Sequence, residues 1–450
     1  MSEVNSKMKK DTFETLLVRV PVLFFSFLYS VFLVKMLGPE GNGLYSFLMS
    51  SLWLSILIFG LDAKKSVMYF IVREEFDTAR VLGLSFTVFG LSSLLVASIV
   101  LSLYLAGSSI THFFIPEEYL NWFFVLFFIA SFICQHFTEM FTNVILGSKE
   151  FRKFNIYLFS SSLLQVILYG SGFLLIHFLG MERNFIQLFS LVLGIQATLL
   201  LMVFIIYLKI IKIKVSFKTK SITRPFIRYS TMNYMDQIGH FLNKRMDVWF
   251  IEFYVGLKSL GVYTLSSQLT NFLLLFSTPV EEVLKPYLIG MERKEGNAVF
   301  VQYFRMTFYL ILGLAMTVFI FSTLIISLFF GDEFMGAVSP LQILAFGVVF
   351  VYFKRMFINY NTAFNDLGIN IWAQWLGVLA TVILDLILIP KHGIVGAAWA
   401  SLIAYSITSI ILGIYFSIKQ KIGPIDLLLL RKEDLIMIRD LLKSQVKRFS

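Results

Sequence analysis

The sequence predicts an all-α polytopic membrane protein with about twelve transmembrane helices, arranged as two six-helix bundles. Of its 450 residues, 58% are hydrophobic and only 15% are charged, and the mean hydropathy is +0.80. A soluble domain cannot bury so much apolar surface in one core. Apolar runs of about 20 residues, long enough to cross the hydrocarbon layer, recur along nearly the whole chain. Strands of a membrane barrel are much shorter and alternate in polarity, so these runs indicate helices.

The expected spans are residues 13–37, 43–63, 81–106, 119–146, 154–180, 184–210, 226–255, 261–290, 300–330, 338–363, 369–390 and 393–418. The first run continues to Leu37 without a small-residue cleavage site, so it is expected to remain as a helix. A long basic connection near 209–228 is the expected hinge. It divides the chain into an N-terminal half, 1–218, a C-terminal half, 219–420, and a basic amphipathic tail, 421–450.

Lys and Arg are distributed unevenly among the connections. The even-numbered connections contain basic segments such as "DAKKSVMYFIVREEFDTAR" and "KIIKIKVSFKTKSITRPFIR", whereas "GSSITHFFIPEEY" and "GDEFMGAVS" have no Lys or Arg. The positive-inside rule therefore predicts that both termini lie in the cytoplasm. The net charge of +10 is then explained by topology, and no nucleic-acid partner is needed to account for it.

A short glycine pattern, G-x4-G-x-Y, occurs twice at an offset of 218 residues. It is found at Gly38, Gly43 and Tyr45, and again at Gly256, Gly261 and Tyr263. The same offset relates Asn143 to Asn361, which favours an internal repeat. Because each half has an even number of spans, the halves are expected to be related by a pseudo-twofold axis along the membrane normal. The glycines are expected to act as structural turns that let helix ends approach closely.

Polar and charged residues form stripes at helical spacing within two predicted spans. The span 226–255 carries Asn233, Asp236, His240, Asn243, Lys244 and Asp247, and the span 261–290 carries Thr264, Gln268, Asn271, Thr278, Glu282 and Lys285. A charge inside the membrane costs about 2.5 to 3.5 kcal/mol on insertion scales, so each needs a reason to be there. Two interpretations stay open: the stripes line a hydrated cavity, or they pair between helices and hold the bundle together.

Several function classes have no support in the sequence. No pair of histidines or cysteines has metal-ligand spacing, and no phosphate-binding loop is present. No soluble segment is large enough to hydrolyse a nucleotide, so an ATP-driven transporter in one chain is excluded, and no cofactor or metal is expected. The single cysteine, Cys134, excludes an intramolecular disulfide and is expected to serve in packing. A membrane glycosyltransferase or polymerase is less favoured because every loop is short.

Three segments carry a family resemblance that runs from about residue 13 to residue 418. They are "VKMLGPEGNGLYSFLMSS", "NKRMDVWFIEFYVGLKSLGVYTLSSQLTNF" and "LILIPKHGIVGAAWASLIAYSI". In this order and at these distances they resemble the polysaccharide-type (O-antigen) flippases of the multidrug/oligosaccharidyl-lipid/polysaccharide (MOP) exporter superfamily. The resemblance implies a fold like that of multidrug and toxin extruders, no enzymatic activity, and a place in the bacterial inner membrane.

The resemblance also implies a substrate, namely undecaprenyl-pyrophosphate-linked repeat units of O-antigen, capsule or exopolysaccharide, moved to the periplasmic leaflet by alternating access. Cationic side chains would then bind the pyrophosphate through charge-assisted hydrogen bonds. The expected substrate-binding residues are Arg19, Lys244, Arg245, Arg355, Lys285, Asn271 and Gln268. The expected ion-coupling or charge-balancing residues are Glu139, Asp236 and Asp247.

The family resemblance and the charge pattern also lead to expectations about partners and about an alternative function. Membrane lipids and the lipid-linked oligosaccharide are expected partners, while a coupling proton or sodium ion and other polysaccharide-export machinery stay open. The tail 421–450 is expected to lie on the inner leaflet as an amphipathic helix. A multidrug extruder of the same superfamily remains the main alternative. Such an extruder needs an acidic cavity for its cationic substrates, and the predicted deep charges are of both signs.

Overall fold

A computed structural model describes residues 2–179, 183–210, 215–232, 234–289 and 291–431. Side chains are described for these residues except 2–19, 151, 179, 232, 235, 236, 279, 282 and 286. Within these ranges the chain forms helices and no strands. It separates into two compact units, one made of Phe24–Gly261 and the other of Met1–Leu23 with Val262–Ser450.

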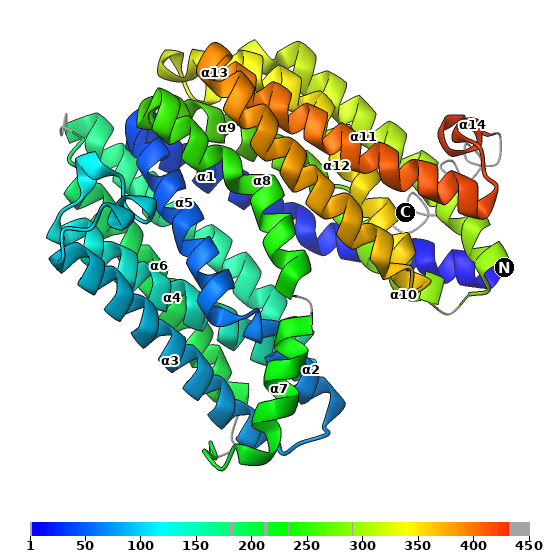
Figure 1. The fold of residues 1–450 in the computed structure, drawn as a ribbon, viewed down its shortest axis with the longest axis horizontal. Coiled ribbons are helices and arrows are strands. Elements are labelled where there is room, and N and C mark those ends of the chain that lie inside the picture. The colour runs from blue at the N-terminus through cyan, green and yellow to red at the C-terminus, as the bar shows by residue number, and fades with distance from the viewer. Residues whose placement is uncertain (1, 180–182, 211–214, 233, 290, 432–450) are drawn as a thin grey trace, which may run out of the picture. The chain divides into compact units, whose positions relative to one another are not determined.

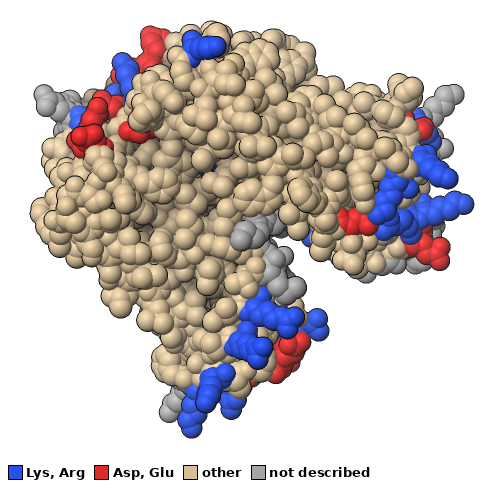
Figure 2. Space-filling view, in the orientation of Figure 1, with Lys and Arg blue, Asp and Glu red and all other residues tan. Residues whose placement is uncertain are grey.

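The unit Phe24–Gly261 contains most of the first eight long helices. They are α1 (Ser2–Gly60), α2 (Ala63–Arg73), α3 (Thr78–Leu105), α4 (Trp122–Gly147), α5 (Phe151–Leu179), α6 (Phe185–Ile210), α7 (Lys220–Met232) and α8 (Tyr234–Val255), with short 3-10 turns η1 (Ser109–Phe113) and η2 (Glu117–Tyr119) before α4. Helix α4 packs against both α3 and α6 (Figure 1). Figure 2 shows Lys and Arg side chains gathered at the end of this unit where α2 and α7 lie, whereas the surface along the helices is almost uncharged.

The second unit contains the remaining elements. They are α9 (Leu257–Leu274), which begins just before the unit boundary, α10 (Thr278–Ile289), α11 (Arg293–Phe329), the 3-10 turn η3 (Asp332–Ala337), α12 (Val338–Ala363), α13 (Leu367–Gln420) and α14 (Pro424–Leu428). Helix α12 packs along both α11 and α13. Residues 432–450, most of the predicted amphipathic tail, lie outside the described residues, so that part of the prediction stays open.

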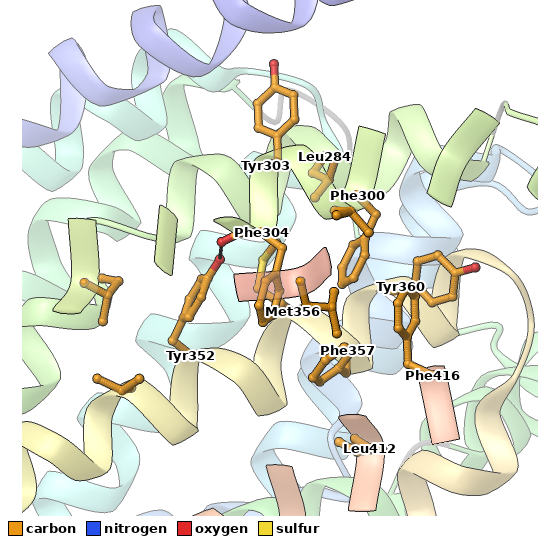
Figure 3. Packing of buried hydrophobic residues seen from close by; sticks show 14 of the residues in the cluster. Leu284, Phe300, Tyr303, Phe304, Tyr352, Met356, Phe357, Tyr360, Leu412 and Phe416 are labelled. Carbon is orange, nitrogen blue, oxygen red and sulfur yellow. Dashed lines mark hydrogen bonds between the residues drawn. The ribbon is translucent and has the colours of Figure 1, made fainter. Parts of the chain in front are cut away.

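Figure 3 shows the aromatic core of this second unit, which α11, α12 and α13 build together. Phe300 and Phe304 from α11 face Tyr352 and Phe357 from α12, and Phe416 from α13 closes the cluster. The Tyr352 hydroxyl donates a 2.8 Å hydrogen bond to the Phe304 carbonyl. Burying such large rings gives each helix an apolar stripe to pack on, and the hydroxyl of Tyr352 finds a backbone acceptor.

Eight helices are long and apolar enough to cross a membrane in the described part of the chain. Two of them, Val20–Gly60 and Leu367–Gln420, are 41 and 54 residues long, and each is a pair of helices joined at a bend. The eight therefore account for ten of the twelve predicted spans. The multi-pass membrane architecture predicted from the sequence is confirmed.

The other two predicted spans are more polar than these, and each is divided. The span 226–255 corresponds to α7 and α8, and 261–290 corresponds to α9 and α10. Helix α8 has 22 residues, which at 1.5 Å per residue is enough to cross the hydrocarbon layer. Three closely spaced charged residues, Lys244, Arg245 and Asp247, make it less apolar than the eight. Between α9 and α10 the chain turns at 275–277, just before Pro279, which has no amide hydrogen to continue a helical ladder.

The predicted glycine turns have the geometry that requires glycine. Gly38 and Gly256 both have positive φ, 68° and 91°, at the same offset as in the sequence repeat. Gly43 and Gly261 do not, but backbone atoms crowd them: a Cβ at Gly43 would lie 1.8 Å from the Leu257 carbonyl oxygen. The first pair therefore uses the conformational freedom of glycine, and the second pair uses its lack of a side chain.

Two amphipathic helices lie, wholly for α2 and partly for α7, in segments that the sequence analysis treated as connections. Helix α2 buries Val67, Phe70 and other residues at helical spacing, and α7 packs against it with Phe226 fully buried. The hydroxyls of Ser66 and Ser230 meet at 2.6 Å in this contact. Helix α7 begins at Lys220, inside the segment predicted as a hinge. The predicted domain limits at 218 and 420 remain predictions.

Candidate functional site

A cavity of about 460 Å³ lies within the unit Phe24–Gly261. Its walls come from α1, α2, α3, α4 and α8. The lining residues are Trp53, Ile56, Leu57, Gly60, Asp62, Ala63, Lys64, Phe89, His136, Glu139, Gln237, His240, Phe241, Lys244 and Arg245. Among them are three basic residues, Lys64, Lys244 and Arg245, and two acidic ones, Asp62 and Glu139, so the formal charge of the lining is +1 with the histidines neutral. The lining thus combines charged and polar side chains with aromatic and aliphatic ones.

The turn between α1 and α2 brings one cation into this cavity. Leu61 and Asp62 both have left-handed backbone conformations, with φ of 50° and 53°, and this ends α1 and starts α2 at once. Asp62 is buried and pairs with Lys65 at 2.8 Å. That pairing holds the first turn of α2 in place and leaves the neighbouring Lys64 to line the cavity.

Lys64 makes the central ion pair of the cavity. Its Nζ atom lies 2.6 Å from Glu139 Oε1 on α4, and it also lies 5.8 Å from the centre of the Trp53 ring. The Lys64 side chain is 33% exposed and that of Glu139 is 15% exposed. The more buried Glu139 needs this partner, since an unpaired buried charge carries a large desolvation cost.

His136 forms part of the cavity wall one helical turn from Glu139. Its ring stacks on Phe89, with centroids 4.2 Å apart, and its Nε2 atom lies 2.8 Å from the Ser92 hydroxyl oxygen. The residue is only 2% exposed. A Cβ at Gly60 would come within 2.8 Å of the His136 ring, so the end of α1 approaches the ring as closely as a glycine allows. These contacts hold His136 in a fixed position.

Helix α8 supplies a further part of the lining. Gln237, His240 and Phe241 come from its first half, and Lys244 and Arg245 follow one turn later. The two cations are adjacent in sequence and both line the cavity. Together with Lys64 they provide several N–H donors, which is the chemistry that binds phosphate oxygens through charge-assisted hydrogen bonds.

The structure brings together three of the residues predicted from the sequence, Glu139, Lys244 and Arg245. Asp247, on the same helix, is 5% exposed and is not part of the lining. The side chains of Arg19 and Asp236 lie outside the described residues, so their predicted roles stay open.

The remaining predicted residues belong to the second unit. Gln268 and Asn271 are half-buried on α9, and Lys285 is half-buried on α10. Arg355, on α12, forms an ion pair with Glu281, 3.0 Å between Nη2 and Oε2. The Ser277 hydroxyl lies 2.7 Å from Glu281 Oε1, so the carboxylate has two partners. Their predicted contact with substrate stays a prediction.

Sequence reasoning missed Lys64 as a site residue, because its segment was counted only as a basic connection. A signal was present: the apolar residues of 63–71 are spaced at one, three and four positions, as in one face of a helix. Read that way, the segment is a short amphipathic helix whose polar edge includes Lys64. No group of His, Cys, Asp or Glu among the described residues is arranged to hold a metal ion.

Comparisons with solved structures agree on the fold. The chain is similar to the lipid II flippase MurJ in an inward closed conformation, with a TM-score of 0.69 and 20% identity, covering 97% of this chain and 92% of that one. It is also similar to a multidrug resistance MATE transporter of the MOP superfamily in an inward-facing conformation, with a TM-score of 0.67 and 14% identity, covering 89% and 96%. These likenesses show the MOP transporter fold.

Two archaeal proteins are similar in sequence. The "Probable low-salt glycan biosynthesis flippase Agl15" of Haloferax volcanii is 27% identical over 255 residues, which is 55% of this chain and 52% of that protein. The "Uncharacterized membrane protein MJ1068" of Methanocaldococcus jannaschii is 27% identical over 208 residues, 45% of this chain and 41% of that one. The matched region thus spans about half the length of each relative.

The family comparison covers more of the chain. The profile of the polysaccharide biosynthesis protein family matches residues 8–292. The lining residues all fall between Trp53 and Arg245, so the matched region includes every residue that lines the cavity. The chain belongs to the polysaccharide biosynthesis protein family.

Proposed function

We propose that the protein is a flippase that moves polyprenyl-pyrophosphate-linked oligosaccharides across the membrane by alternating access. The observation that carries the proposal is the cavity lined by Lys64, Lys244 and Arg245, in a chain of the polysaccharide biosynthesis family with the MOP fold. A pyrophosphate that leaves the aqueous phase loses its hydration. Donors on three cationic side chains replace that hydration with charge-assisted hydrogen bonds.

The substrate is a repeat unit on undecaprenyl pyrophosphate, a precursor of O-antigen, capsule or exopolysaccharide, and the site of action is the bacterial inner membrane with both termini in the cytoplasm. The basic even-numbered connections support this orientation. In this proposal the protein is a transporter and not an enzyme. The sugar sits in the cavity while the polyprenyl chain remains in the bilayer, which avoids moving a long apolar chain through a polar space.

A deletion strain of the native host tests the proposal. Loss of the protein is expected to remove surface glycan and to cause lipid-linked repeat units to accumulate, as seen by gel and by lipid extraction. Wild-type protein restores the glycan, whereas the double variant Lys244→Ala/Arg245→Ala, which removes two of the three cavity cations, fails to restore it. Lys258→Ala, which changes an exposed cation outside the lining, is the matched control and restores the glycan fully.

The same strain distinguishes the proposal from multidrug extrusion. If surface glycan is unchanged and the deletion strain becomes sensitive to cationic drugs, the flippase proposal is wrong. If the glycan is lost but the Lys244→Ala/Arg245→Ala variant restores it, the protein acts on the glycan but the cavity is not its headgroup site.

A further inference from the structure

The ion pair of Lys64 and Glu139 creates a conflict for any anion that enters this cavity. Lys64 donates to Glu139 at 2.6 Å, so this cation is already paired with a carboxylate. The same carboxylate lines the 460 Å³ cavity that the anion would enter. Two negative groups confined in one small, partly desolvated space repel each other strongly. The cavity therefore cannot bind a pyrophosphate well while Glu139 is charged and holds Lys64.

We infer that Lys64 is a phosphate-binding residue that is paired with Glu139 while the cavity is empty, and that Glu139 takes up one proton from the solvent when the headgroup binds. In this exchange the Lys64 ammonium turns from the carboxylate to a phosphate oxygen and keeps its charge. The Glu139 carboxylate gains a proton and becomes a neutral carboxylic acid. The inference rests on the proposed function and adds a linkage between headgroup binding and protonation at that site.

The surroundings of Glu139 favour this residue as the one that exchanges. The other carboxylate of the lining, Asp62, has its own partner in Lys65 at 2.8 Å, and Lys65 is not part of the lining. Asp62 can thus remain charged when an anion enters. Glu139, by contrast, pairs with Lys64, which is itself a lining residue.

The other titratable and charged groups that face Glu139 come from two helices. His136, on its own helix, is fixed by Phe89 and Ser92. His240, Lys244 and Arg245 approach from α8. On α8, the imidazole of His240 is the group that can compete with Glu139 for a proton. A decisive test must therefore separate Glu139 from His240.

The side chain of Lys64 has the freedom that the exchange needs. It is one-third exposed although its partner is mostly buried, and it lies on the first turn of a short helix. Its four-carbon stem can rotate the ammonium without moving the backbone. By linkage, whatever protonates Glu139 must strengthen headgroup binding, and headgroup binding must promote protonation of Glu139 to the same extent.

Calorimetry on the purified full chain tests this inference with farnesyl pyrophosphate as the probe. Binding is measured in two buffers of different ionisation enthalpy, which gives the number of protons taken up. We expect about one proton per bound probe near neutral pH for the wild type, and a Kd that falls by up to about tenfold for each unit of acidification. Glu139→Gln is expected to bind at least as tightly, with no proton uptake at this site.

Three further variants make the test specific. Lys64→Gln is expected to bind about tenfold more weakly and to take up no proton, while Lys64→Arg, which keeps the pairing, retains both properties. Glu150→Gln removes a comparable ion pair, with Lys153 at 3.1 Å, outside the cavity and should behave as wild type. Because every protein meets the same probe, the probe's own titration cancels in each comparison.

The outcomes separate the inference from the proposed function. If the wild type does not bind the probe, the cavity is not a pyrophosphate site and the proposed function fails together with the inference. If the wild type binds without proton uptake, or if uptake persists in Glu139→Gln and is lost in His240→Gln, only the inference is wrong.

Discussion

Replacing Gly43 by alanine tests a close contact between two backbone segments in the unit Phe24–Gly261. A Cβ at this position would lie 1.8 Å from the carbonyl oxygen of Leu257 and 2.7 Å from its carbonyl carbon. Contacts shorter than 3.0 Å essentially never occur at real Cβ atoms, so the two backbones must separate by about 1.2 Å. No side-chain rotation relieves this clash, because both neighbouring atoms belong to the main chain.

The separation also stretches a buried hydrogen bond. The Asn42 side-chain amide donates to the Gly261 carbonyl at 2.7 Å in the same contact. Overpacking of this kind costs about 1 to 3 kcal/mol, and a typical intramolecular hydrogen bond contributes about 0.5 to 1.5 kcal/mol. We expect Gly43→Ala to lower the free energy of unfolding by about 2 to 4 kcal/mol, summed from those two ranges with partial relaxation.

Thermal unfolding in detergent, followed by fluorescence-detected size exclusion, measures this loss. Gly90→Ala is the matched control, because nothing lies within 4 Å of a Cβ there and alanine favours the helix by up to about 1 kcal/mol. The Tm of Gly43→Ala should be lower than that of Gly90→Ala by several degrees. Equal Tm values for the two variants would refute the close contact.

A double variant sharpens the argument. A Cβ at Gly261 would lie 1.7 Å from the Pro39 carbonyl oxygen, in the same contact seen from the other side. One separation of the backbones makes room for both methyl groups. Gly43→Ala/Gly261→Ala should therefore be less destabilised than the sum of the single variants, by about 1 kcal/mol or more. Strict additivity would mean that the two glycines do not share a contact.

Two further predictions concern the second unit. The Asp366 carboxylate accepts hydrogen bonds from Arg293 at 3.2 Å and from Lys419 at 2.6 Å, and its side chain is 13% exposed. Asp366→Asn should therefore lower the Tm by a few degrees, and high salt should reduce the difference from wild type. An unchanged Tm at low salt would contradict this prediction. Arg305, buried on α11, donates to the Asp426 carbonyl at 2.8 Å, so Arg305→Met should release α14 and make it more sensitive to limited proteolysis than in the wild type.

The bends within the two longest helices could be predicted from local sequence, because each needs a backbone conformation with positive φ that glycine adopts more readily than other residues. Gly38 and Gly393 both have positive φ, 68° and 56°, and each joins two spans that the hydropathy had already separated. The place of such a bend depends only on the few residues around the glycine. Element lengths in a membrane are also a local property, since the bilayer sets them.

The grouping of the polar residues could not be predicted in the same way. Helical spacing shows that Lys244 lies in a polar stripe, but it does not say which other helix that stripe meets. The structure places Lys244 and Glu139 in one cavity and pairs Arg355 with Glu281. A partner on another helix depends on packing between segments that are far apart in sequence, and no periodicity within one segment contains that information.

Lys64 shows why a positive-inside count does not by itself explain basic residues at the membrane surface. Its segment "DAKKSV" contributes two lysines to the topological signal, and both count equally there. In the structure they differ: Lys65 pairs with Asp62 in the turn, whereas Lys64 pairs with Glu139 inside the cavity. A cation near a helix end can therefore orient the chain and also line a binding site. The net charge of +10 contains at least one residue of this second kind, and the amphipathic spacing of α2 is what distinguishes it.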